Sequence, residues 1–291
     1  MLRIEVSGDF VKESVPTRMT SSKKGDNGTV LVVGGNKIYH GAPILASLSA
    51  LRSGTDLVYT AVPRTNIVSV RSHSPNIIAL PLSTDELTTR SAKWLLSNLP
   101  RKPDAAAIGM GMTIANSAAL ATLIVGLQSI GTKLLLDASA LVPETLKEIS
   151  GTNAVITPHP GEYRRIFEQD VGSNQNEQIS NICKLSEEYG ITIVLKGFTN
   201  FISSFFDNDV RIALVSRTTP AMTVGGCGDV LSGLISGFLT KLSPFEASVL
   251  GIYFNGLAAS KVYDQVGLHM MATDLLEKLP DVMKAFDKIK E

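Results

Sequence analysis

The chain has 291 residues, and its 27 lysines and arginines balance 27 aspartates and glutamates, so the formal net charge is zero. With 44 % hydrophobic and 19 % charged residues it can bury a large core, which argues against intrinsic disorder. A neutral chain also lacks the long-range attraction that draws basic proteins to nucleic acid or anionic membranes, and we expect neither partner. Its paired basic residues, such as Arg164-Arg165, are expected to be solvated surface.

The cysteines and the N-terminus indicate the compartment. Cys183 and Cys227 lie far apart and the four histidines are scattered, so no zinc site of the usual spacing is expected. Two free thiols fit a reducing compartment, and the first 15 residues lack the apolar core of a signal peptide. The longest uncharged stretch, residues 105–132, is interrupted by glycines and polar residues. We therefore expect a soluble cytoplasmic protein.

Short apolar runs alternate with helical segments along most of the chain. Strands are predicted at residues 29–33, 56–62, 75–80, 104–108, 133–137, 153–157 and 191–195. Helices are predicted at 41–53, in a segment that carries Trp94 and is capped at 84–87, and from Asn116 to about Gln128. Asp207-Asn208-Asp209 is typical of a hairpin turn between strands 198–206 and 210–216, and the tail from Gly226 is helical in three pieces.

This alternation predicts a single α/β domain over residues 1–291. We expect a three-layer sandwich with a mostly parallel sheet, helices on both faces and a hairpin edge. In such a sheet ligands bind beyond the carboxyl ends of the strands, so functional residues should follow the strands. Small residues over 42–50 also predict close helix packing, within the chain or between subunits.

One glycine-rich segment carries the clearest functional signal. The chain has no Gly-Lys pair for a Walker A loop, and Gly109-Met-Gly111 lacks the third glycine of a dinucleotide fingerprint. Residues 223–233, by contrast, read TVGGCGDVLSG at the start of a helix. The glycines let backbone N–H groups approach an anion, and the helix N-terminus adds partial positive charge. Asp229 could simply complement the helix dipole, but the glycines favour a phosphate site where it takes a proton from an attacking hydroxyl.

Gly226-Cys-Gly-Asp229 resembles the GxGD signature of the ribokinase-like superfamily. The longer segment 220–233 resembles one branch of it, the ADP/ATP-dependent NAD(P)H-hydrate dehydratases. Further landmarks of that family are matched in order along nearly the whole chain, at residues 23–31, 41–45, 52–54, 157–162 and 272–276.

The resemblance implies a ribokinase-like fold and a metabolite-repair reaction. The substrate is the S epimer of NADHX or NADPHX, in which water has added at C6 of the nicotinamide ring. The reaction converts it back to NADH or NADPH. ADP or ATP, with Mg²⁺, phosphorylates the C6 hydroxyl, so that phosphate leaves in place of hydroxide. Asp229 would be the base. The choices between ADP and ATP and between NADHX and NADPHX stay open, and so do the metal ligands.

The same resemblance assigns binding residues. Ala42, Gly111, His159 and Asp229 would contact the hydrate. The nucleotide and its phosphates would contact Lys196, Gly197, Phe198, Thr199, Asn200, Gly225, Gly226, Cys227 and Gly228. Glu162 either caps a helix or orients groups around phosphate or magnesium. His159 could instead be an ordinary loop histidine, and Lys196 an ordinary surface lysine.

Two departures from the family pattern affect the expected site. Ser139 stands where the family commonly has an aspartate, and Cys227 stands where a threonine is common. The epimerase domain fused to many relatives is expected to be absent, so a separate NAD(P)HX epimerase would supply the S epimer. The resemblance also implies a homo-oligomer, such as a tetramer.

Two alternative functions remain. A small-molecule kinase of the same superfamily, such as a hydroxyethylthiazole kinase, would use Asp229 in the same way but release a phosphorylated product. A non-catalytic nucleotide-binding sensor would keep the pocket without turnover. The segment 157–162 and the length of the match favour the dehydratase, and the intact Asp229 disfavours the sensor.

Overall fold

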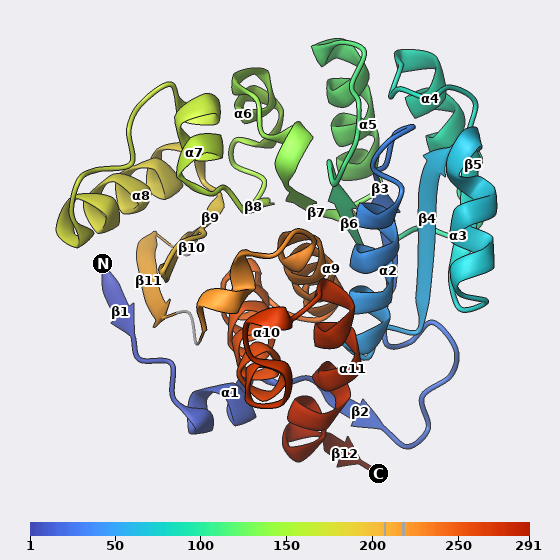
Figure 1. Cartoon of the computed structure of the whole chain (residues 1–291). Helices are drawn as coiled ribbons and strands as arrows, with labels where there is room; N and C mark the ends of the chain where they lie inside the picture. The colour runs from blue at the N-terminus through green and yellow to red at the C-terminus, as the bar shows by residue number, and fades with distance from the viewer. Residues whose placement is uncertain (207, 217–218) are drawn as a thin grey trace.

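The computed structural model describes residues 1–206, 208–216 and 219–291 (Figure 1). The strands are β1 Leu2–Ile4, β2 Thr17–Met19, β3 Thr29–Val33, β4 Leu57–Pro63, β5 Ile78–Leu82, β6 Ala105–Ile108, β7 Lys133–Leu136, β8 Val155–Ile156, β9 Thr192–Leu195, β10 Thr199–Phe206, β11 Asp209–Ser216 and β12 Lys288–Lys290. The α-helices are α1 Gly8–Ser14, α2 Gly41–Arg52, α3 Ile67–His73, α4 Thr89–Ser97, α5 Ser117–Ser129, α6 Pro143–Ile149, α7 Pro160–Phe167, α8 Gln175–Tyr189, α9 Cys227–Leu239, α10 Pro244–Val266 and α11 Ala272–Met283. Every strand predicted from the sequence is present, with bounds shifted by up to three residues.

Ten strands form one mixed sheet in the order β1-β11-β10-β9-β8-β7-β6-β3-β4-β5. Neighbours from β9 across to β5 are parallel, whereas β10 is antiparallel to both β9 and β11. The predicted hairpin is therefore confirmed, although Asp207 of its turn lies outside the described residues. The chain passes from β3 to β4 on one side and later returns to place β6 on the other side of β3.

Alternate residues of the central strands face two separate cores, because successive side chains of a strand point to opposite faces. Val30 and Val32 of β3 pack in one core with residues of α2, α9, α10 and α11. Leu31 and Val33 pack in the other core with residues of α4 to α8. Figure 1 shows these two helix layers on either side of the sheet, with α5, α6 and α7 above the strands and α9, α10 and α11, in orange and red, below them. The predicted three-layer α/β sandwich is confirmed.

Two features at the ends of the sheet differ from the prediction. β1 pairs in parallel with β11 through Leu2–Ile4, so the hairpin does not form the sheet edge. A second, two-stranded sheet joins β2 to β12 near the C-terminus. These strands have three residues each and show no extended apolar run, which is why the sequence pattern missed them.

The helix that carries Trp94 begins later than predicted. Leu87 is extended and buried because it exchanges backbone hydrogen bonds with the segment 113–115 in an isolated bridge. The N-cap is therefore Thr88, whose side chain accepts from the Ser91 N–H, and not a residue of 84–87. The predicted cap of α5 is confirmed, since the Asn116 side chain accepts from the Ala119 N–H at 2.9 Å.

The small residues of α2 pack against α9 of the same chain. A Cβ on Gly233 would lie 2.0 Å from the Ala46 carbonyl oxygen, so the two backbones are in direct contact. Ser49 adds a hydrogen bond to the Val230 carbonyl. This face is therefore used inside the molecule, and it fixes the N-terminus of α9 against α2. No helix in the described part of the chain is both long and apolar enough to span a bilayer.

Candidate active site

The predicted functional segments meet at the carboxyl edge of the sheet. Gly34 follows β3 and Gly109 follows β6, the two strands between which the chain order reverses. Asp137 follows β7, and Lys196 follows β9. Open α/β sheets bind ligands at such a reversal because the connections diverge there and leave a crevice.

The N-terminus of α9 points into this crevice with its first N–H groups uncapped. Gly226 is the N-cap residue, at φ +97°, and no side chain from the described residues caps the helix. The first-turn N–H groups have no partner inside a helix, so an anion can take that place. The position of a Cβ on Gly225 is open, whereas a Cβ on Gly226 would lie 2.7 Å from Leu45 Cδ1 and 2.8 Å from Ala272 Cβ.

We expect Gly226→Ala to destabilise the protein by about 2 kcal/mol or more, because a side chain at positive φ is strained and the Cβ meets two packed neighbours. Gly225→Ala is the matched control, since it adds the same methyl group one residue earlier into open space. Urea unfolding of both variants measures the difference. Equal free energies of unfolding for the two variants would contradict the requirement for glycine at 226.

Two pockets share the first turn of α9. The smaller, of about 270 Å³, is lined by Cys227 and Gly228. The larger, of about 550 Å³, is lined by Gly225, Gly226 and Asp229. The first turn of α9 therefore borders both pockets, and its carboxylate lines the larger one, an arrangement suited to direct transfer of a group from one ligand to another.

The residues assigned by resemblance divide between these pockets. The larger pocket also takes Ala42, Gly111 and Ser139. The smaller pocket takes Lys196, Gly197 and Asn200, and it takes His159 too, which the resemblance had placed with the hydrate. Phe198 is 74 % exposed. Neither Phe198 nor Thr199 is among the described residues that line the smaller pocket, and Gly225 and Gly226 line the larger one.

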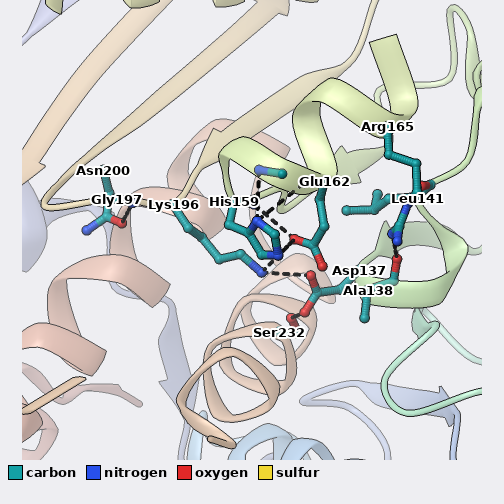
Figure 2. A network of polar contacts seen from close by, with 11 residues as sticks. Asp137, Ala138, Leu141, His159, Glu162, Arg165, Lys196, Gly197, Asn200 and Ser232 are labelled. Carbon is teal, nitrogen blue, oxygen red and sulfur yellow. Dashed lines mark hydrogen bonds and ion pairs between the residues drawn. The ribbon is translucent and has the colours of Figure 1, made fainter. Parts of the chain in front are cut away.

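Lys196 belongs to a buried ion-pair network and is not an ordinary surface lysine. Its Nζ lies 2.9 Å from Asp137 Oδ1 and 3.5 Å from Glu162 Oε2 (Figure 2). Ser232 Oγ donates to Asp137 Oδ2 at 2.7 Å. Burial opposes charge on both partners, but their attraction prevails: the pKa of Asp137 is lowered and the pKa of Lys196 is raised. The ammonium group therefore stays charged beside the helix N-terminus, 3.8 Å from where a Cβ of Gly228 would lie.

Asp229 has the proton affinity of a general base that works near neutral pH. Burial is the main cause that raises its pKa to about 7, and the negative charges of Asp137 and Glu162 raise it further against the opposing effect of Lys196. A base is most effective when its pKa lies near the working pH. Burial also raises the pKa of the Cys227 thiol to about 11, so that thiol stays protonated next to the phosphate site.

His159 and Glu162 form a capping box at the start of α7. His159 Nδ1 accepts from the N–H groups of Gly161 and Glu162, and Glu162 Oε2 accepts from the His159 N–H at 2.9 Å. Because Nδ1 accepts, the proton of a neutral imidazole lies on Nε2, the nitrogen that faces Glu162 Oε2 at 3.6 Å. Glu162 thus caps the helix and also faces Lys196, and its role in orienting groups around phosphate or magnesium stays a prediction.

The roles of Asp137 and Arg165 at the site were not predicted. Asp137 is 3 % exposed and pairs with Lys196, and its signal in the sequence is a lone acid directly after a buried Leu-Leu-Leu strand. Arg165 is exposed, as expected, and its guanidinium also donates to the carbonyls of Ala138 and Leu141 (Figure 2). It thereby supports the turn that brings Ser139 to the larger pocket. Its neighbour Arg164 pairs with the exposed Asp170, as a surface residue does.

Comparison with known proteins agrees with this geometry. A family model described as NAD(P)H-hydrate dehydratase matches residues 30–281. The ADP-dependent (S)-NAD(P)H-hydrate dehydratase of Nitrosopumilus maritimus is 49 % identical over 290 residues, covering 99 % of this chain and 100 % of that protein. The bifunctional NAD(P)H-hydrate repair enzyme Nnr of Pyrobaculum aerophilum is 37 % identical over 97 % of this chain, which spans 56 % of that longer enzyme.

Solved structures show the same relationship. The ADP/ATP-dependent NAD(P)H-hydrate dehydratase of Bacillus subtilis, co-crystallised with ATP and Mg²⁺, superposes with a TM-score of 0.81 at 26 % identity, covering 97 % of this chain and 98 % of that one. A ribokinase-like protein of Enterococcus faecalis, at 22 % identity and a TM-score of 0.79, supports the ribokinase-like fold. The hydroxyethylthiazole kinase of Pyrococcus horikoshii is only 14 % identical, with a TM-score of 0.63, and shares the fold alone. With the family model matched over most of its length and a full-length relative at 49 % identity, the chain belongs to the NAD(P)H-hydrate dehydratase family.

Proposed function

We propose that this protein dehydrates the S epimer of NADHX or NADPHX to NADH or NADPH at the expense of a nucleoside phosphate. The observation that carries the proposal is the position of Asp229, with a pKa of about 7, at an uncapped helix N-terminus shared by two pockets. The nucleotide occupies the smaller pocket, where Lys196 and Gly228 meet its phosphates. The hydrated nicotinamide ring occupies the larger pocket beside Asp229.

Asp229 removes the proton from the C6 hydroxyl as that oxygen attacks the terminal phosphoryl group. The N–H groups of the α9 first turn stabilise the negative charge on the transferring group. The lone pair of the ring nitrogen then expels phosphate from C6, and loss of a proton from C5 restores the ring double bond. Phosphorylation is needed because hydroxide is a poor leaving group and phosphate is a good one.

ADP is the donor that we propose, with AMP and phosphate as products. Two relatives that match nearly their full length, at 49 % and 47 % identity, are named ADP-dependent enzymes. Mg²⁺ bound to the phosphates supplies neutralising charge. Among the described residues no group of three or more His, Cys, Asp or Glu side chains could hold a metal ion. We assign Glu162, which faces Lys196, to orienting an ion that the phosphates carry.

Several wider properties also remain proposals. We infer one domain over residues 1–291, because both cores share the same sheet. From the family resemblance, and because some relatives are named bifunctional repair enzymes, we infer functional pairing with an NAD(P)HX epimerase that supplies the S epimer. The buried free thiols of Cys183 and Cys227 support a reducing cytoplasm. From the family resemblance we also infer a homo-oligomer, such as a tetramer.

Incubation of the protein with NADPHX, Mg²⁺ and either ADP or ATP tests the proposal. We expect the absorbance band of NADPH to return, with AMP and phosphate released in equal amounts when ADP is supplied. Rates with the two nucleotides side by side decide the donor. A phosphorylated alcohol that accumulates without recovery of NADPH would replace the proposal by the kinase alternative, and nucleotide binding with no turnover would replace it by the sensor.

A further inference from the structure

Two kinds of residue line the smaller pocket. Lys196 and Gly228 lie beside the helix N-terminus and the network of Asp137. Met222 before α9, Leu231 on α9 and Ile252 on α10 add apolar side chains. In the proposed reaction the phosphates lie against Lys196 and Gly228, because the transferred group must reach Asp229 in the same first turn of α9. The flat base of the nucleotide is then left for the apolar part of the lining.

Asn255 is a polar residue among these apolar lining residues. It lies in the middle of α10, lines the pocket with Ile252 and Gly256, and is 2 % exposed. Its amide oxygen Oδ1 is buried and makes no hydrogen bond with any described residue. A buried acceptor without a partner costs about 1–3 kcal/mol, so the position would be better filled by a leucine unless a ligand supplies the partner. Four described residues carry such an oxygen, and Asn255 is the one of them that lines this pocket.

We propose that Asn255 reads the nucleotide base and selects adenine. This inference rests on the proposed use of the smaller pocket for the nucleotide. An asparagine amide pairs with adenine by accepting from the exocyclic amino group and donating to an adjacent ring nitrogen. Hypoxanthine and guanine carry a carbonyl oxygen where adenine carries that amino group, so Oδ1 would face another acceptor. Such a mismatch lowers affinity by about 10-fold to 100-fold.

Isothermal titration of the unmodified protein with ADP and with IDP, without any hydrate, is the first test. The two nucleotides share ribose and phosphates and differ only in the base. We expect ADP to bind at least about 10-fold more tightly. Equal affinities overturn the inference, and this comparison needs no variant to fold.

Asn255→Leu is the second test. It removes both hydrogen-bonding groups at similar volume, so we expect the preference for ADP over IDP to fall at least fivefold, through weaker ADP binding. Thr29→Val is the matched control: it also replaces a buried residue whose side-chain oxygen lacks a partner, but at the start of β3 and outside the pocket. We expect it to keep the preference, and loss of preference in both variants overturns the inference.

These outcomes separate the inference from the dehydratase proposal. Discrimination between ADP and IDP with no recovery of NADPH supports the role of Asn255 and overturns the dehydratase proposal alone. Recovery of NADPH at equal rates and affinities with ADP and IDP overturns the role of Asn255 and leaves the dehydratase intact. Failure of both nucleotides to bind overturns the two together.

Discussion

Asp229→Asn is expected to lower kcat by about 10²–10⁴-fold while ADP binding stays within a few-fold of the unmodified protein. The amide keeps the size and the polar contacts of the side chain but cannot accept the substrate proton. In the unmodified enzyme, kcat/KM should fall about tenfold per pH unit below about pH 7, because the pKa of Asp229 is raised to about 7 and only its ionised form is a base. Recovery of NADPH across a pH series measures both effects.

The same substitution should stabilise the fold above neutral pH. The folded protein holds the Asp229 proton up to about pH 7, whereas the unfolded chain releases it near the ordinary aspartate pKa of 3.8. The unfolded state thus binds fewer protons in this interval, so the contribution of Asp229 to stability falls as pH rises, by about 4 kcal/mol in all. Asp229→Asn removes this loss, and its Tm should exceed that of the unmodified protein at pH 8 but not at pH 4.

Glu246→Gln provides the control for a general helix-dipole effect. Glu246 is also a first-turn acid, on α10, and it accepts from Ser243 in a capping box. Its substitution should leave kcat unchanged and should not raise the Tm. Full activity in Asp229→Asn would overturn the assignment of Asp229 as the base. A Tm of Asp229→Asn below that of the unmodified protein at pH 8 would show that the buried, ionised carboxylate does not destabilise the fold.

Lys196→Met is expected to destabilise the protein by about 3–5 kcal/mol, because Asp137 is left as a buried carboxylate without its ion-pair partner. It should also lower kcat/KM by about 10²-fold, since a charged contact to phosphate is lost. The remaining activity should need a higher pH, because the positive charge of Lys196 lowers the pKa of Asp229. Urea unfolding and the pH profile measure these effects separately.

The double variant Lys196→Met/Asp137→Leu separates the effect of Lys196 on folding stability from its effect on catalysis. Removing both charges should restore most of the lost stability without restoring activity. Lys133→Met is the surface control, since this lysine, at the start of β7, donates to the Leu242 carbonyl at 2.9 Å. An unchanged free energy of unfolding in Lys196→Met would contradict the buried ion pair.

Much of the fold could be predicted because its strands are buried on both faces and bounded by glycines. An apolar, β-branched run such as Thr29–Val33, followed by two glycines, is typical of an interior parallel strand. β1 escaped prediction because Leu2–Ile4 is only three residues long and becomes a strand only by pairing with β11. The start of α4 was misplaced because a long-range bridge holds Leu87 extended, and no local pattern records such a contact.

The part of the site that depends on backbone chemistry left a pattern in the sequence. The three glycines before Asp229 predict an anion site, because they free backbone N–H groups at the start of a helix. Which pocket each residue lines depends on distances across the sheet, so the sequence could not predict that His159 lines the smaller pocket, and its contact with the hydrate stays a prediction. Asp137 and Asn255 were missed as site residues because their importance lies in burial, which a sequence does not show for a single polar residue.

The shared first turn of α9 also has a kinetic consequence. Since the two pockets are lined by different residues of one turn, the two proposed reactants can be bound at the same time. The phosphoryl group can then pass directly from one reactant to the other, without a covalent phosphoenzyme intermediate. Catalysis should pass through a ternary complex, in which neither product has to depart before the second reactant arrives.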